Sequence, residues 1–170
     1  METNNNEKKN KIEYPYLPEG RTILYVPENN EFIQAAKKFA KENSLDSNFP
    51  TGSVAVKDNK IIGYGANGTD YHKTHECERV KNHIPTGQGY ELCEGCHPKN
   101  HSESRAVKNV IDNGFDPKGT DLYLWGHHWC CEPCWKSMIE SGIKDVYLME
   151  GSEILFDRTK EGNIVGHQFE

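Results

Sequence analysis

The sequence lacks an excess of positive charge and lacks any long apolar run. Its 170 residues carry 20 Lys and Arg against 26 Asp and Glu, for a formal net charge of −6 at pH 7. Proteins that follow phosphate backbones usually have a basic surface, so this balance disfavours a polynucleotide partner. No segment approaches the roughly 18 apolar residues that a membrane-spanning helix needs, so no membrane partner is expected.

The start of the chain also lacks the apolar core of a secretory signal, because METNNNEKKNKIEY is polar. We therefore expect a cytoplasmic protein whose six cysteines meet a reducing environment, where stable disulfides are rare. Metal binding, redox chemistry and plain burial remain as explanations of these cysteines, and we favour metal binding. A disulfide framework stays as an alternative.

The length fits one domain with a sizeable core. We predict a flexible N-terminal arm over residues 1–20 and a single domain over residues 21–170. Residues 68–100 show no clear period and are rich in His, Cys, Gly and Lys, so they are expected to form an insert with a functional or metal-binding role.

Apolar periodicity and turn residues predict alternating helices and strands outside this insert. The expected elements are a helix at 29–44 capped by Asn30, two strands within 52–68, a helix from 102 to Gly114, a strand at 121–126, a helix at 132–142 and a strand at 143–150. Strands separated by helices predict crossovers with parallel pairing, and the hairpin adds antiparallel pairing. The predicted fold class is α/β, a three-layer α/β/α sandwich with a mixed sheet.

The stretch HHWCCEPCW, residues 127–135, holds half of the cysteines. Cys131 and Cys134 flank the start of one predicted helix, and His101 begins another. Helix N-termini favour thiolates. If both helices leave the same ends of neighbouring parallel strands, the three side chains meet and form a three-ligand zinc site. Its fourth position stays open, which is typical of catalytic zinc.

Glu103 stands two residues after His101, so its carboxylate is expected to face the open position without binding the metal. Zinc makes water acidic near neutral pH, and a neighbouring carboxylate can then carry protons. A zinc-bound water beside a carboxylate is suited to the attack of water on an electron-poor ring carbon.

The motifs HSESRAV and WCCEPCW resemble the signature of the zinc-dependent cytidine and deoxycytidylate deaminase superfamily, H-x-E followed by P-C-x-x-C. GYGANG is similar to the end of that superfamily's second strand, and the resemblance covers residues 29–150. It implies a cytidine deaminase-like fold in which His101, Cys131 and Cys134 bind zinc. It also implies that Glu103 is the general acid and base.

The resemblance further implies that Asn67 holds the sugar or base and that the backbone near Ser102 and Trp129 lines the base pocket. The chain departs from the family pattern at Cys130, where a proline is usual. It also departs at Arg105, where an asparagine is usual. The Arg105 side chain could contact a phosphate of the substrate. Superfamily members usually assemble, so a homo-oligomer is expected.

The insert has few apolar residues with which to form a core, so its fold needs another source of stability. A four-ligand zinc would supply it. We predict a second, structural zinc site at Cys77, Cys93, Cys96 and His97, with His72 and His75 also eligible as the histidine ligand. An insert of this length ahead of the His-x-Glu motif resembles deoxycytidylate deaminases more than cytidine deaminases, which favours a nucleotide substrate.

The predicted function is therefore zinc-dependent hydrolysis of a free cytosine nucleotide in nucleotide metabolism, with dCMP converted to dUMP and ammonia. One alternative is a deaminase acting on cytidine, guanine or a base within tRNA or single-stranded DNA. Another is a non-catalytic module in which Cys93, Cys96, Cys131 and Cys134 share one zinc. A redox Cys-x-x-Cys protein is a further alternative.

Overall fold

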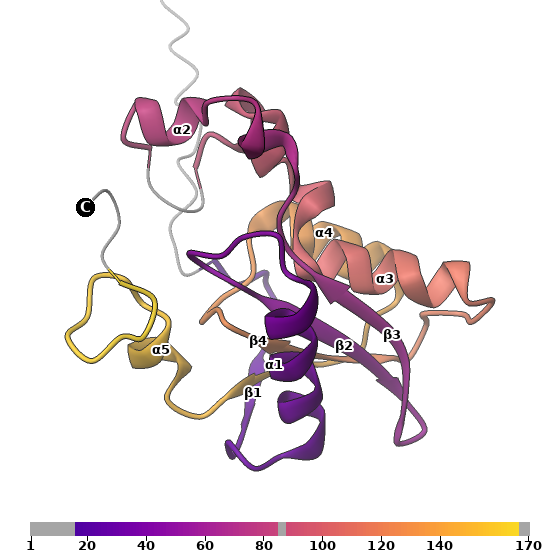
Figure 1. The fold of residues 1–170 in the computed structure, drawn as a ribbon. Coiled ribbons are helices and arrows are strands. Elements are labelled where there is room, and N and C mark those ends of the chain that lie inside the picture. The colour runs from indigo at the N-terminus through magenta and orange to yellow at the C-terminus, as the bar shows by residue number, and fades with distance from the viewer. Residues whose placement is uncertain (1–15, 85–87, 167–170) are drawn as a thin grey trace, which may run out of the picture.

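Five strands form one mixed sheet in the computed structural model, which describes residues 16–84 and 88–166. The strands are β1 (Ile23–Val26), β2 (Gly52–Lys57), β3 (Lys60–Ala66), β4 (Asp121–Trp125) and β5 (Val146–Met149). Their order across the sheet is β1-β5-β4-β2-β3 (Figure 1). β1, β5 and β4 pair in parallel, whereas β2 pairs antiparallel with both β4 and β3, so the predicted mixed sheet is confirmed.

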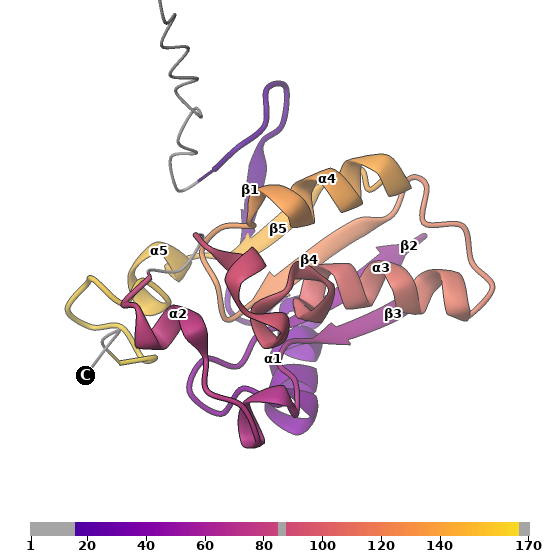
Figure 2. The same ribbon diagram turned by 90° about the horizontal axis from the view of Figure 1, so that it is seen from above.

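Helices cover both faces of the sheet. On one face lies α1 (Glu31–Asn43), and on the other α3 (Ser102–Asp112) and α4 (Glu132–Ser141) lie side by side (Figure 2). A short helix, α5 (Ser152–Leu155), follows β5. The predicted three-layer α/β/α sandwich is therefore confirmed. Within the described residues, no helix combines the length and the apolar character needed to cross a membrane.

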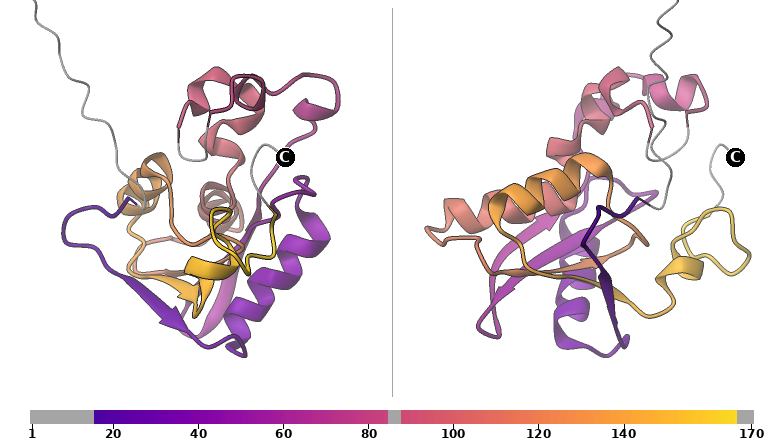
Figure 3. Two further views of the ribbon diagram at one scale, coloured as in Figure 1. Left: turned by 90° about the vertical axis from the view of Figure 1, so that its left-hand side faces the viewer. Right: turned by 180° about the vertical axis from the view of Figure 1, so that it is seen from behind.

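The Cys- and His-rich insert contains only short helical turns among its described residues. They are η1 (Tyr71–Lys73), α2 (Glu78–Lys81), η2 (Tyr90–Leu92), η3 (Glu94–Cys96) and η4 (Pro98–Asn100). The insert projects from the end of the sandwich at which α3 begins, as Figures 1 and 3 show from several sides. The predicted N-terminal arm lies mostly outside the described residues, and the single domain over residues 21–170 stays a prediction.

The central strand β4 shows how one sequence fills two cores. Successive side chains of a strand point to opposite faces. Leu122 and Leu124 accordingly pack with α3 and α4, while Tyr123 and Trp125 pack with α1. All four side chains are buried, so this strand is apolar on both faces and lies in the middle of the sandwich.

The predicted helix ends are confirmed by the hydrogen bonds that cap them. The Asn30 side chain accepts from the backbone N–H groups of Phe32 at 2.9 Å and Ile33 at 3.1 Å, so it caps α1. Gly142, at a φ of 86°, ends α4 in the left-handed conformation that favours glycine.

One expectation about the sheet is wrong, and one strand, β1, is not predicted from the sequence. The strands that lead to the two site helices, β3 and β4, run in the same direction, but β2 lies between them. The ends of β3 and β4 still meet one edge of the sheet, because Ala66 and Trp125 both pair with Gly52.

Two glycines of β3 allow α3 to lie unusually close to the sheet. A Cβ atom at Gly65 would stand 2.1 Å from the backbone oxygen of Ser102 and 2.4 Å from the backbone nitrogen of Ala106. A Cβ atom at Gly63 would stand 2.9 Å from the Ala106 oxygen. The glycines of GYG therefore set the depth at which the start of α3 lies.

Gly65→Ala is expected to destabilise the fold by about 1–3 kcal/mol, because the added methyl group meets backbone atoms that cannot rotate away. Chemical denaturation would measure the free energy of unfolding. Tyr64→Phe, in the adjacent half-exposed position, is the matched control and should change it by less than about 0.5 kcal/mol. Equal stability of the two variants would contradict the close packing of α3.

Candidate metal centre and active site

The structure brings His101, Cys131 and Cys134 together as one group. Their donor atoms all lie within 4.8 Å of one another. The His101 Nδ1 atom is 3.4 Å from the Cys131 sulfur and 3.3 Å from the Cys134 sulfur. Two donors bound to one tetrahedral zinc lie about 3.5 Å apart, given bonds of about 2.0–2.3 Å. The residues present therefore fit a zinc ion.

The starts of two helices create this group. His101 occupies the N-cap position of α3 and Cys131 that of α4, with Cys134 in the first turn of α4. Neither N-cap side chain bonds to its own helix, so both remain available to a metal. Since β3 and β4 end at the same edge of the sheet, the helices that follow them begin near each other.

The protonation of the two cysteines differs before any metal is bound. A hydrogen bond from Cys134, assisted by His101, lowers the pKa of Cys131 to about 6 despite burial. The same hydrogen bond, together with burial, raises the pKa of Cys134 well above the usual value. At neutral pH the pair thus holds one thiolate, and metal binding would release the second proton.

The donor set matches a catalytic rather than a closed zinc site. Within the described ranges this group offers three donors, whereas structural zinc normally has four protein ligands. The Glu103 side chain is 6% exposed and contacts Cys134, yet it is not one of the donors. A carboxylate beside an open metal position can take and return protons.

Two buried serines orient that carboxylate. The Ser102 hydroxyl donates to Glu103 Oε1 at 2.8 Å and lies 2.9 Å from the hydroxyl of Ser53. Both serine side chains are fully buried. Ser102 therefore contacts the Glu103 carboxylate through its side chain, and the predicted role of its backbone stays a prediction.

Cys130 has no place in the metal group. It is fully buried, and burial raises the pKa of its thiol well above the usual value. The neutral thiol packs in the core that α3 and α4 share.

The neighbouring Trp129 is also buried, with its ring edge-on to the ring of His127 at a centroid distance of 4.5 Å. His127 stays uncharged at neutral pH, since burial, assisted by the charges of His128 and His101, lowers its pKa to about 3.

A second group of donors forms in the insert from His72, Cys77, Cys93 and Cys96. The His72 Nε2 atom lies 3.2 Å from the Cys93 sulfur, and the sulfurs of Cys77 and Cys96 are 3.6 Å apart. All four donors lie within 4.8 Å of one another. One imidazole and three thiolates make a closed set, which fits structural zinc.

Of the three histidines eligible for this second site, His72 lies in the group, whereas the predicted His97 lies outside it. The His97 Nδ1 atom instead accepts from the backbone N–H of Lys99 at 3.0 Å and so caps η4. His75, the other eligible histidine, is exposed and stacks on Tyr71 at 4.2 Å. Sequence spacing could not choose among these histidines, since the choice depends on how the insert folds back.

Asn67 uses most of its side chain to hold a neighbouring loop. Its Oδ1 atom accepts from the Ser44 hydroxyl at 2.5 Å and from the Thr51 N–H at 2.9 Å. Its amide nitrogen donates to the Phe49 carbonyl at 2.9 Å. One amide hydrogen remains for a sugar or base, so the predicted substrate contact at Asn67 stays a prediction with only this donor to support it.

Arg105 also contacts the scaffold. One terminal nitrogen donates to the Ala66 carbonyl at 2.9 Å and the other to Asn100 Oδ1 at 3.1 Å. These bonds tie α3 to the end of β3 and to the insert. The predicted phosphate contact at Arg105 stays a prediction, and the guanidinium already has a positioning role.

Among the described residues, sequence reasoning missed Ser53, Ser104 and Tyr90, which contact the site. Ser53 reaches Ser102 from β2, and a polar residue in the buried run SVAV was the available signal. Tyr90 packs edge-on against the His101 ring at 4.8 Å, and it also underlies the Arg79 guanidinium. Tyr90 could not be found from the sequence because its contact depends on the path of the insert.

The chain belongs to the family described as the cytidine and deoxycytidylate deaminase zinc-binding region, whose profile matches residues 27–150. The match confirms the resemblance carried by HSESRAV and WCCEPCW. Membership identifies a hydrolytic deaminase family, and the His and Cys groups agree with its zinc-binding character.

Individual proteins that resemble the chain come from several sources. Deoxycytidylate deaminase of Pongo abelii is 30% identical over 124 residues, which cover 70% of this chain and 63% of that protein. ComE operon protein 2 of Bacillus subtilis is 26% identical over 125 residues, which cover 71% and 59%. The chain thus spans about three fifths of the length of these curated relatives. A dCMP deaminase of the cyanophage S-TIM5, in complex with dCMP and dUMP, matches with a TM-score of 0.48 and 21% identity over 72% of this chain and 82% of that one.

Proposed function

We propose that this protein is a zinc-dependent deaminase of a free cytosine nucleotide, converting dCMP to dUMP and ammonia. The observation that carries the proposal is the buried carboxylate of Glu103 beside the three-donor group of His101, Cys131 and Cys134. A three-ligand zinc with an adjacent proton carrier is suited to hydrolysis, whereas a closed four-ligand site is not.

In the proposed reaction, zinc would supply the Lewis acidity that makes a water molecule nucleophilic near neutral pH. Glu103 takes a proton from the attacking water and delivers it to N3 of the cytosine ring. The water oxygen bonds to C4, the bond from C4 to the amino nitrogen breaks, and Glu103 transfers the second proton to the departing amine. Water and cytosine thereby become uracil and ammonia, and Glu103 returns to its starting state.

The surrounding residues keep Glu103 in a single orientation for these transfers. The hydroxyl of Ser102 holds one carboxylate oxygen, and Ser53 supports Ser102 from the sheet. Both serines are buried, so water does not compete for these hydrogen bonds. Such preorganisation contributes to catalysis because little rearrangement is needed during the reaction.

Two observations favour a free nucleotide as the substrate. The net charge of −6 disfavours the tracking of a polynucleotide backbone. Relatives that cover about 70% of the chain are named deoxycytidylate deaminase. We extend the proposal to a second, structural zinc at His72, Cys77, Cys93 and Cys96, and to a cytoplasmic homo-oligomer.

Ammonia release from a panel of five compounds tests the substrate. The panel contains dCMP, CMP, deoxycytidine, cytidine and guanine. We expect dCMP to exceed deoxycytidine in kcat/KM by about tenfold or more, since hydrogen bonds to a charged phosphate contribute about 1.5–3 kcal/mol. If only guanine or only a nucleoside were turned over, the proposed substrate would be wrong, whereas hydrolytic deamination would remain the reaction. No turnover by the zinc-loaded chain on any compound would favour the non-catalytic zinc module or a polynucleotide substrate.

A further inference from the structure

The two Cys and His groups are separated by a very short piece of chain. Cys96 belongs to the second group and His101 to the first, and His97 and the turn η4 that it caps lie between them. The turn is held by backbone bonds from Asn100 N–H to the His97 carbonyl at 2.9 Å and from His101 N–H to the Pro98 carbonyl at 3.0 Å. A movement of Cys96 would therefore be transmitted to His101.

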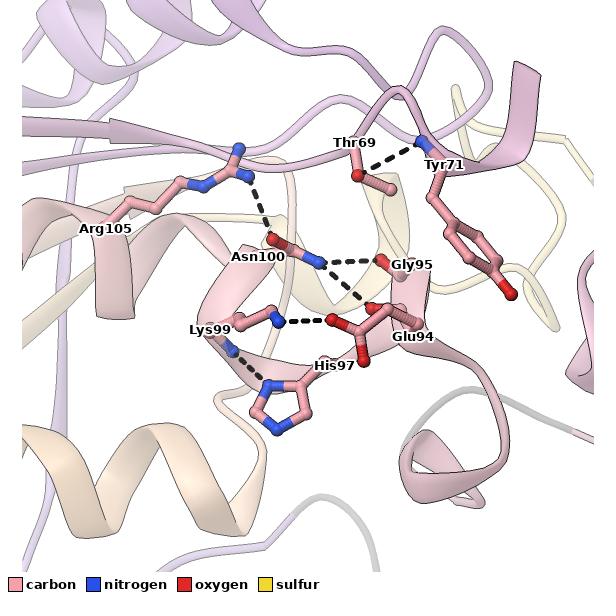
Figure 4. Close-up of polar contacts among 8 residues, drawn as sticks. All are labelled: Thr69, Tyr71, Glu94, Gly95, His97, Lys99, Asn100 and Arg105. Carbon is pink, nitrogen blue, oxygen red and sulfur yellow. Dashed lines mark hydrogen bonds and ion pairs between the residues drawn. The ribbon is translucent and has the colours of Figure 1, made fainter. Parts of the chain in front are cut away.

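Asn100 connects three parts of the molecule, and Figure 4 shows the bonds that its side chain makes. Its side-chain nitrogen donates to the carbonyls of Glu94 and Gly95, both at 3.2 Å, in the turn that carries Cys96. Its Oδ1 atom accepts from Arg105 on α3 at 3.1 Å. Its backbone carbonyl accepts from the N–H of Gly68, just after β3, at 3.2 Å.

The same turn touches a ligand of each group. Gly95 lies against the second-group ligand His72, since a Cβ atom there would stand 2.6 Å from the ring nitrogen Nε2. The carbonyl of Cys96 is in hydrogen-bonding contact with the ring of His101, whose Nδ1 atom faces the other two first-group ligands. Partners of this kind fix the orientation of a metal-binding imidazole.

We propose that Asn100 is a positioning residue for His101, through which the second group controls how firmly the first group holds its metal. The inference rests on the proposal that both groups bind zinc. It gives the insert a role beyond its own folding: with the second group filled, the turn η3 is fixed, and Asn100 transmits that fixed geometry to the start of α3.

Zinc release to an excess of the chromogenic chelator 4-(2-pyridylazo)resorcinol tests the inference on the intact, zinc-loaded chain. Cys131→Ala and Cys93→Ala assign the release phases to the first and the second group. Asn100→Ala is expected to speed release from the first group by about tenfold, because it frees the turn whose Cys96 carbonyl contacts the His101 ring, and direct partners of a metal ligand contribute about 10–100-fold. Cys93→Ala should do the same, because it empties the second group.

Lys99→Ala is the matched control. Lys99 neighbours Asn100 in η4 and pairs with Glu94 of η3, but this ion pair is exposed to solvent (Figure 4). The control should release first-group zinc at the rate of the unaltered chain. Equal first-group release rates for Asn100→Ala and Lys99→Ala would overturn the inference, and so would slow first-group release from Cys93→Ala.

A spectroscopic measurement separates positioning from general loosening. Refilling the first group with Co²⁺ gives visible absorption that depends on the arrangement of the ligands. Asn100→Ala should alter these bands relative to Lys99→Ala, whereas unchanged bands would overturn the inference. If Asn100→Ala does not fold, Arg105→Lys replaces it, since it shortens the group that reaches Asn100. Neither measurement uses a nucleotide, so a failure of the proposed substrate would leave the inference independently tested.

Discussion

Glu103→Gln is expected to lower kcat on dCMP by about 10²–10⁴-fold, the usual contribution of a positioned general acid and base. Glutamine keeps the size of the side chain and can keep the hydrogen bond from Ser102. It cannot take a proton from water, so the chemical step loses its proton carrier. Zinc content should remain that of the unaltered chain, because Glu103 is not one of the grouped donors.

The matched control for this substitution is Glu140→Gln, at an exposed position near the end of α4. It removes the same charge from the protein and should leave kcat and zinc content unchanged. Steady-state kinetics and metal analysis of the two variants are compared side by side. If Glu103→Gln retained the kcat of Glu140→Gln, the proposed proton carrier would be wrong.

Cys131→Ala is expected to remove about one zinc per chain and to lower kcat by roughly 10³-fold or more. A bound metal contributes several kcal/mol to the stabilisation of the transition state, and each 1.36 kcal/mol corresponds to about tenfold in rate. With one thiolate missing, His101 and Cys134 provide only two donors. Loss of metal and loss of turnover should therefore occur together.

The adjacent Cys130→Ala provides the sharpest control, since it removes the neighbouring sulfur from the same segment. Cys130 behaves as a small buried hydrophobic residue, so its loss should cost about 1 kcal/mol of stability and no zinc. Metal content is measured by atomic absorption and stability by denaturation. Zinc loss in Cys130→Ala with retention in Cys131→Ala would show that the ligands were misassigned.

The grouping of His101, Cys131 and Cys134 was predictable because the spacing within each of its two parts is local. A histidine and a Cys-x-x-Cys pair each occupy the start of a helix, and helix starts after parallel-running strands meet at one edge of a sheet. This holds although β2 lies between β3 and β4. The prediction needed only the direction of the strands, which the alternation of helices and strands indicated, and not their order.

Other features depend on contacts between distant segments. The four residues of β1 form a strand only through pairing with β5, far along the chain, and their apolar run alone does not identify one. The insert has no periodic pattern, so nothing local places His72 rather than His97 in the group with the three cysteines. The side-chain bonds of Asn67 likewise depend on the loop around Phe49.

Reconstitution of the metal-free chain tests the central claim most directly. Zinc is returned in steps to the chelator-treated protein, and the conversion of dCMP to dUMP is followed by ultraviolet absorbance and ammonia release. We expect no conversion without zinc, and a rate that rises in proportion to the zinc bound by His101, Cys131 and Cys134. Conversion by the metal-free protein at the full rate would contradict the account, and so would the absence of conversion once both metal groups are filled.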